Sequence, residues 1–261
     1  MIRIEYAGIV ASPALAEKIN PFYRDLSLKV KECERMLGRF LMVSLLLLPL
    51  WALAAESDTQ RLNESTKVVD ELMNAGDKAI PSDLFHKAYC VVVIPSMKKG
   101  GFIFSGKYGR GFASCRNPGG GWTAPGAMRV EGGGFGLQIG GESADIVMLV
   151  MSEKGEKGLL ASKFTLGAEA SGAAGPVGRD ATAQTDATMH ADILSWSRSK
   201  GVFGGLSLQS GTLRPDSDVN QTLYGQKQDN KDILTGKVKA TADATSFLET
   251  LTKYGGTTQT K

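Results

Sequence analysis

The chain has 261 residues with a formal net charge of +3, and 42% of its residues are apolar. This apolar fraction supplies a real core and excludes general disorder, and the 32 glycines follow no Gly-X-Y repeat, which excludes collagen. Two of the three excess positive charges lie in residues 1–54, so the remaining chain has no global field that would attract nucleic acid.

The first 54 residues resemble a targeting segment. Arg35 to Arg39 precede an apolar run, Phe40 to Ala54, which ends in small residues. This order is typical of a secretory signal peptide, and the run is shorter than the roughly 20 residues that a bilayer span needs. We predict a signal peptide over residues 36–54, cleaved after Ala54; an uncleaved anchor helix is the alternative. Residues 1–35 are expected to be a non-native upstream extension.

The cleaved chain would be periplasmic or secreted and peripheral on a membrane. It begins with helical spacing over Asp58–Ala75, where Leu62, Val68 and Leu72 fall near one face. Ser82 is a suitable N-cap for a second, short helix.

From Tyr89 onward, the spacing of apolar residues changes from that of helices to that of strands. We predict strands, one short helix over Glu156–Ser162, and a hairpin around residues 199–201. The predicted strands are Tyr89–Ile94, Gly101–Arg116, Trp122–Val130, Gly134–Gly140, Asp145–Ser152, Lys163–Ala170, Ala191–Arg198 and Val202–Leu213.

Two helices are expected near the C-terminus, Asp216–Leu223 and Thr241–Tyr254, joined by a polar connection that includes Asp232–Thr235. Short strands with tight turns favour antiparallel pairing. The predicted fold class is therefore α+β: a glycine-rich, mainly antiparallel sheet or sandwich with peripheral helices at both ends. We expect a single domain over residues 57–254 and a flexible tail over 255–261.

Cys90 and Cys115 are the two cysteines of the predicted mature chain. In an oxidising compartment they would suit a disulfide. Two buried free thiols are the alternative. Two cysteines and two histidines make a metal site unexpected, and no metal or cofactor is predicted.

Catalytic motifs are incomplete. Ser96-Met-Lys-Lys99 matches the Ser-x-x-Lys acylation motif, but its partner motifs are missing and Pro95 and Gly100 predict a turn. The stretch from Gly101 to Lys107 has Tyr108 where a phosphate loop needs Ser or Thr. We predict no catalytic residue and no enzymatic activity.

Six segments, in this order, resemble the SYLF domain. They are Val93–Gly101, Gly106–Gly111, Gly121–Pro125, Gly136–Gly140, Ala173–Arg179 and Leu213–Asp216. The resemblance spans roughly Ser65 to Tyr224. It implies phospholipid binding, best known for phosphoinositides in eukaryotic members, and an actin-regulatory context in fungal ones.

Basic residues flanked by small or rigid ones supply the candidate lipid contacts. They are Lys98, Lys99, Lys107, Arg110, Arg129, Arg179 and Arg214. Lys98 and Lys99 are expected on a glycine-flanked loop that approaches a membrane. The leading hypothesis is a non-enzymatic protein that binds anionic phospholipid head groups through this basic loop surface. The alternatives are a scaffolding envelope protein that binds a protein partner, and a hydrolase with an unrecognised site.

Overall fold

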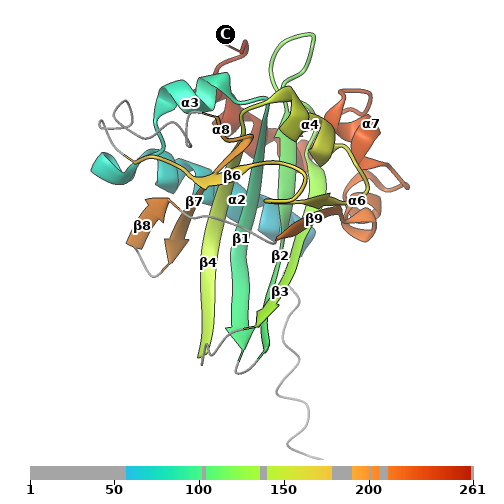
Figure 1. Ribbon diagram of the computed structural model, residues 1–261. Coiled ribbons are helices and arrows are strands. Elements are labelled where there is room, and N and C mark those ends of the chain that lie inside the picture. Colours follow the sequence, from blue (N-terminus) through green and yellow to red (C-terminus); the bar gives the residue numbers. More distant parts are fainter. Residues whose placement is uncertain are drawn as a thin grey trace, which may run out of the picture. The chain divides into compact units, whose positions relative to one another are not determined.

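The fold is taken from a computed structural model, which describes residues 57–101, 104–135, 140–177, 190–199, 202–205 and 211–259. The predicted signal peptide and the stretch before it lie outside these residues, as does Arg179. The described residues form one sheet of nine strands with helices on both of its faces (Figure 1). The predicted α+β class is confirmed.

Four long strands form the centre of the sheet. The strands are β1 (Cys90–Gly101), β2 (Phe104–Cys115), β3 (Gly126–Phe135), β4 (Gly140–Val150), β5 (Phe164–Thr165), β6 (Gly172–Ala174), β7 (Ile193–Ser199), β8 (Val202–Gly205) and β9 (Thr212–Pro215). Their order is β5-β9-β3-β2-β1-β4-β7-β6, with β8 paired to β7. All pairs are antiparallel except β6 with β7.

The helices are short apart from the first. They are α2 (Asp58–Met73), α3 (Ser82–Lys87), α4 (Glu153–Leu159), α6 (Ser217–Tyr224), α7 (Asn230–Leu234) and α8 (Thr245–Gly255), with 3₁₀ turns at Gly76–Lys78 and Ala242–Ala244. A capping box starts α2, because Ser57 Oγ accepts from the Gln60 backbone N–H and the Gln60 side chain accepts from the Ser57 backbone N–H.

The apolar run at the start of β1 is buried on both sides. Val91 and Val93 pack toward α2 and α8, while Val92 and Ile94 pack toward α4 and β5. In Figure 1, α2 passes behind the long strands and α4 lies in front of them. Alternate side chains of one strand therefore enter two separate cores, which explains why the run has no polar face.

Several predicted boundaries are wrong. Ser82 is the first residue of α3 rather than its cap, and α4 begins three residues before the predicted Glu156. The predicted strand over 122–130 begins later, at Gly126, and continues to Phe135 as β3, whereas residues 136–139 of the predicted strand over 134–140 lie outside the described residues. The stretch Asp232–Thr235, expected to be a polar connection, belongs largely to α7, whose Ile233 and Leu234 are buried.

Two further predicted strands are only partly present: Lys163–Ala170 is a strand only over Phe164–Thr165, and Val202–Leu213 contributes β8 and the first residues of β9, with 206–210 outside the described residues. The first and last helices form as α2 and α8, and β7 pairs with β8 around the predicted hairpin turn. In the segment expected to be a flexible tail, the Thr257 carbonyl accepts from the Gly121 N–H at 2.7 Å, and Gln259 donates to the Lys87 carbonyl at 2.8 Å. These hydrogen bonds hold Thr257 and Gln259 against the domain, whereas residues 260–261 lie outside the described residues.

Candidate functional site

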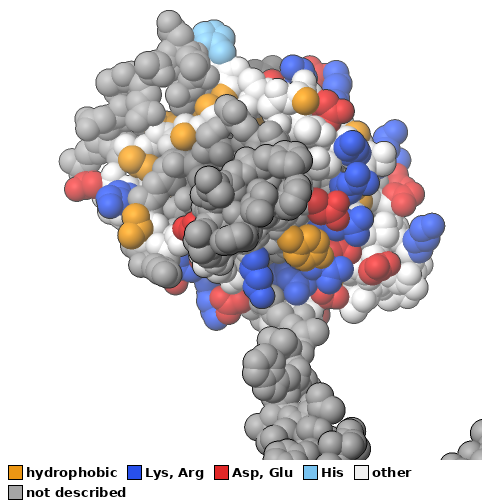
Figure 2. Space-filling view, turned by 60° about the horizontal axis from the view of Figure 1, so that its bottom comes forward, with side chains coloured by type: hydrophobic (Ala, Val, Ile, Leu, Met, Phe, Trp, Pro, Cys, Tyr) orange, Lys and Arg blue, Asp and Glu red, His pale blue; other side chains and the backbone are white. Residues whose placement is uncertain are grey.

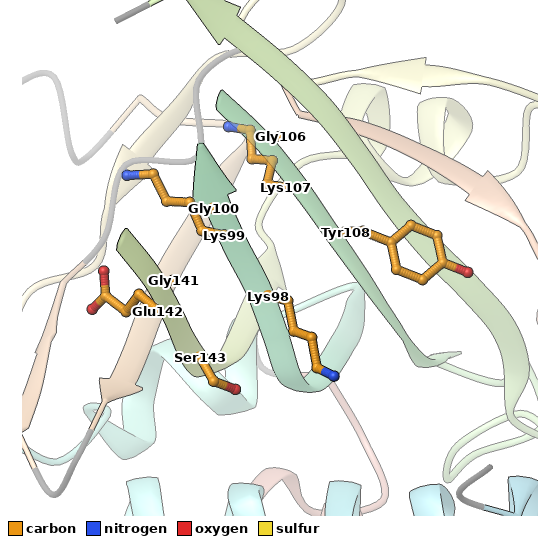
Figure 3. A pocket seen from close by; sticks show the side chains of 9 residues that line it. All are labelled: Lys98, Lys99, Gly100, Gly106, Lys107, Tyr108, Gly141, Glu142 and Ser143. Carbon is orange, nitrogen blue, oxygen red and sulfur yellow. The ribbon is translucent and has the colours of Figure 1, made fainter. Parts of the chain in front are cut away.

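Three of the predicted lysines surround one open hollow at the glycine-rich end of the long strands. The hollow has a volume of about 540 Å³. Figure 3 shows its side chains, which come from β1, β2 and β4: Lys98, Lys99, Lys107, Tyr108, Glu142 and Ser143. Figure 2, turned to bring this end forward, shows basic side chains with acidic ones among them.

The prediction that Lys98 and Lys99 lie on a loop is wrong, because β1 continues through them to Gly101. A β-bulge makes this continuation compatible with Pro95. Pairing with β4 shifts register between Ile94 and Met97, and Ser96 has a φ of 50°.

Polar contacts to the half-buried Asp145 hold the bulge in place. The Ser96 N–H donates to Oδ1 of Asp145 at 2.8 Å, and Arg198 Nε donates to Oδ2 of the same carboxylate at 2.9 Å. Gly111 of β2 lies against the bulge, where a Cβ would come within 1.9 Å of the Val93 carbonyl oxygen. The bulge therefore requires glycine at this position of β2.

Beyond the bulge, the lysines divide between the two faces of the sheet. Lys98 is directly opposite Tyr108, and Lys99 is directly opposite Lys107. Opposed residues of an antiparallel pair share a face, and successive residues of a strand do not. In Figure 3, the side chains of Lys99 and Lys107 extend together, away from that of Lys98. The sequence predicts a single basic surface, but these lysines form two clusters on opposite faces of the sheet. Both clusters line the same hollow.

Glu142 of β4 is the register partner of Lys99, so the cluster of Lys99 and Lys107 also contains one carboxylate. Burial is the main cause that lowers the pKa of Lys107, and the neighbouring charge of Lys99 lowers this pKa further. Lys98 and Lys99 are exposed, and Tyr108 is 48% exposed. An exposed tyrosine beside cations combines an apolar ring with a polar tip, which suits an interface between water and an apolar phase.

Arg110 is committed to an internal ion pair. Its Nε donates to Oδ2 of Asp216 at 2.6 Å and its Nη2 donates to Oδ1 at 3.1 Å. The Asp216 side chain is 1% exposed, and its hydrogen bonds are the main cause that raises the pKa of Arg110. The structure therefore gives Arg110 a structural role that competes with the predicted contact to lipid.

Arg129 and Arg214 lie together but line a different hollow. They are direct partners across β3 and β9, and both form ion pairs with Glu131. Arg110 and Arg129 are also register partners, so the three arginines and Lys98 share one face of the sheet.

Cys90 and Cys115 form a disulfide between register partners of β1 and β2. The structure thus contains the bonded form rather than two free thiols. Glu156 brings a carboxylate oxygen to within 4.8 Å of the two sulfur atoms. Because the sulfurs are bonded to each other, this group does not offer a metal the thiolates it would need.

Sequence reasoning missed the neutral and acidic members of the hollow: Tyr108, Glu142 and Ser143. Their signal in the sequence was weak, because only the register of β1 with β2 and β4 brings them beside the lysines. Among the described helices, none is long and apolar enough to cross a membrane.

Comparison with known proteins gives one family. Residues 131–254 match the Ysc84 family model, described as Las17-binding protein actin regulator. The chain is similar to Protein YSC84 of Saccharomyces cerevisiae, with 34% identity over 67% of this chain and 38% of the relative.

Two further relatives carry SH3 domains in their names. An SH3 domain-containing protein of Schizosaccharomyces pombe is 36% identical over 69% of this chain and 42% of its own length. The SH3 domain-containing YSC84-like protein 1 of Rattus norvegicus is 30% identical over 77% of this chain and 58% of its own length. The chain thus spans between 38% and 58% of these relatives.

Proposed function

Because this chain carries a domain of the Ysc84/SYLF family, we propose that it is a non-enzymatic binding protein that contacts anionic phospholipid head groups. The contact surface is the end of the sheet formed by β1, β2 and β4, around Lys98, Lys99 and Lys107. It is a strand surface, in place of the loop surface expected from the sequence.

One observation carries this proposal: three lysines and an exposed tyrosine surround a single open hollow. Each lysine near an anionic membrane surface contributes about 1 kcal/mol, so three contribute about 3 kcal/mol, or a factor of roughly 100 in partitioning. Glu142 lowers this attraction, which makes the surface selective for strongly anionic membranes.

The cellular address forms part of the proposal. Residues 36–54 have the pattern of a signal peptide, which would deliver the domain to a periplasmic or extracellular face. At that address the protein would be peripheral on the membrane.

A protein partner is the second candidate. The family is described as Las17-binding, and two Saccharomyces cerevisiae relatives are named LAS seventeen-binding protein 3. Val202, 66% exposed at the β7–β8 hairpin, is the kind of isolated apolar side chain that a partner would cover. A pull-down that recovers a specific protein, with no lipid affinity, would favour this scaffold function.

Vesicle sedimentation of the full chain tests the lipid proposal. We expect binding to vesicles of phosphatidylglycerol and phosphatidylcholine. It should weaken by more than about 100-fold in the triple variant Lys98→Glu, Lys99→Glu and Lys107→Glu, because the attraction is lost and repulsion is added. Raised salt should weaken binding of the parent protein.

A matched control reverses charge elsewhere. Lys227 and Lys239 are exposed and lie outside the hollow. With the likewise exposed Lys78, the triple variant Lys78→Glu, Lys227→Glu and Lys239→Glu reverses the same number of charges and should leave vesicle binding within about twofold of the parent. Equal loss in both charge-reversal variants, or no binding of the parent to anionic vesicles, would contradict the proposal.

A further inference from the structure

A second hollow lies beside β9, where the chain enters α6. Its volume is about 420 Å³, and it is lined by Arg129, Arg214 and Lys231 together with the hydroxyl-bearing Ser162 and Ser217. It shares no lining residue with the hollow between β1, β2 and β4.

Arg129 and Arg214 each have an Nε–H donor without a hydrogen-bond acceptor among the described residues. Arg129 Nε is 2.9 Å from Oε1 of Glu131, and Arg214 Nε is 3.5 Å from Oε2 of the same carboxylate. These contacts lack hydrogen-bond geometry, and both Nε atoms are shielded from solvent with no hydrogen-bond partner in the described part of the chain. Shielded donors without acceptors are rare in native proteins, and a ligand, an ion or a water is a candidate acceptor.

The start of α6 adds further donors. Asp216 is the N-cap residue of this eight-residue helix but makes no capping hydrogen bond, because both of its carboxylate oxygens accept from Arg110. The first N–H groups of a helix have no partner within the helix and carry partial positive charge. Ser217, the first residue of α6, lines the hollow.

The charges around the hollow are unbalanced. Among the described residues, the lining carries three cations, Arg129, Arg214 and Lys231, and one carboxylate, that of Asp229, while Glu131 forms ion pairs with both arginines. A guanidinium group binds phosphate oxygens in pairs, and two adjacent guanidinium groups suit a group with several free oxygens. A phosphate monoester offers three such oxygens and close to two negative charges, whereas a diester offers two oxygens and one charge.

We propose that this hollow is a binding site for a phosphate monoester dianion. The site does not depend on the membrane contact proposed above, because a soluble phosphate would occupy it as well as a lipid head group with a terminal phosphate. The negative charge of Asp229 in the lining repels a bound phosphate, so removing this charge is expected to tighten phosphate binding.

The first measurement is isothermal titration of the full chain with inorganic phosphate at constant ionic strength. We expect saturable binding that weakens about tenfold or more in Arg214→Gln and in Lys231→Gln, because each removes a charged hydrogen-bond donor. Asp229→Asn should tighten binding, because it removes a repulsive charge. Lys231 and Asp229 are exposed, so these two variants test the site without disturbing the sheet.

The second measurement separates lipid from soluble phosphate. Vesicles with phosphatidic acid, which has a monoester phosphate, are compared with vesicles of equal charge made with phosphatidylglycerol, a diester. A preference for phosphatidic acid that disappears in Lys231→Gln supports the site with a lipid ligand; binding of inorganic phosphate alone supports it with a soluble one.

The control is Lys99→Gln in the other hollow. It should weaken vesicle binding and leave phosphate titration unchanged, so a failure of the membrane proposal would leave this inference intact. The inference is overturned if the parent chain binds no phosphate, or if Lys231→Gln and Asp229→Asn, folded as judged by circular dichroism, bind it as the parent does.

Discussion

Arg116 illustrates at the residue scale how a charge can be half-buried without a carboxylate partner among the described residues. Its guanidinium group donates to five backbone carbonyls and lies 4.0 Å above the ring of Trp122. The acceptors belong to Phe85, His86, Ala88, Gly255 and Gly256. Burial lowers the pKa of Arg116 to about 10. The residue donates to carbonyls at the ends of α3 and α8, of which that of Phe85 also accepts from the Ala88 N–H.

We expect Arg116→Met to lower the free energy of unfolding by about 3 kcal/mol, because it strands these carbonyls and removes the cation above Trp122. Arg116→Lys should recover only part of the loss, because one ammonium group cannot span both helix ends. Urea denaturation measures both changes, with the exposed Lys239→Met as a control expected within about 0.5 kcal/mol of the parent. Equal stability of the parent and Arg116→Met would refute this role.

At the scale of elements, a carboxylate adds a polar link to the apolar contact between α2 and α8. Oδ1 of Asp70 accepts hydrogen bonds from the Tyr254 hydroxyl and from Lys253 Nζ. These two bonds, that of Tyr254 first, lower the pKa of Asp70 below 3.8. A carboxyl whose pKa is lower in the folded state stabilises the fold above its unfolded pKa and loses this contribution as the pH falls through the folded pKa.

Asp70→Asn should therefore destabilise the protein at pH 7 by less than about 1 kcal/mol, because the pair is largely exposed. The difference from the parent should shrink as the pH is lowered through and below 3.8. Urea denaturation of both proteins at a series of pH values measures it. A stability difference between Asp70→Asn and the parent that grows as the pH falls would contradict this expectation.

At the scale of the whole molecule, the disulfide joins the two central strands, β1 and β2. It closes a loop over a sequence separation of 25 residues, for which the chain-entropy model gives a stabilisation of about 3 kcal/mol. We expect Cys90→Ala with Cys115→Ala to lose about this amount in urea denaturation. The parent measured in excess dithiol should approach the variant, and a parent that is equally stable with and without the dithiol would contradict the expectation.

The features predictable from the sequence are those with local signals. The period of Asp58–Ala75 predicts α2, and the apolar run before Pro95 predicts a buried strand. The bulge after Ile94 was not predictable, because Asp145 stabilises it from another strand. The same holds for the site: the lysines could be named from sequence, but their distribution between two faces depends on register.

The bulge at Ser96 has a consequence for how this surface could evolve. Each β1 side chain after the bulge points to its face of the sheet because β1 contains one extra residue there. Deleting one codon at the bulge would therefore exchange the environments of Lys98 and Lys99 without altering either residue. A duplication of one codon would do the same. Insertions and deletions at this point can therefore redirect charge between the two sides of the domain, whereas substitutions change only its amount.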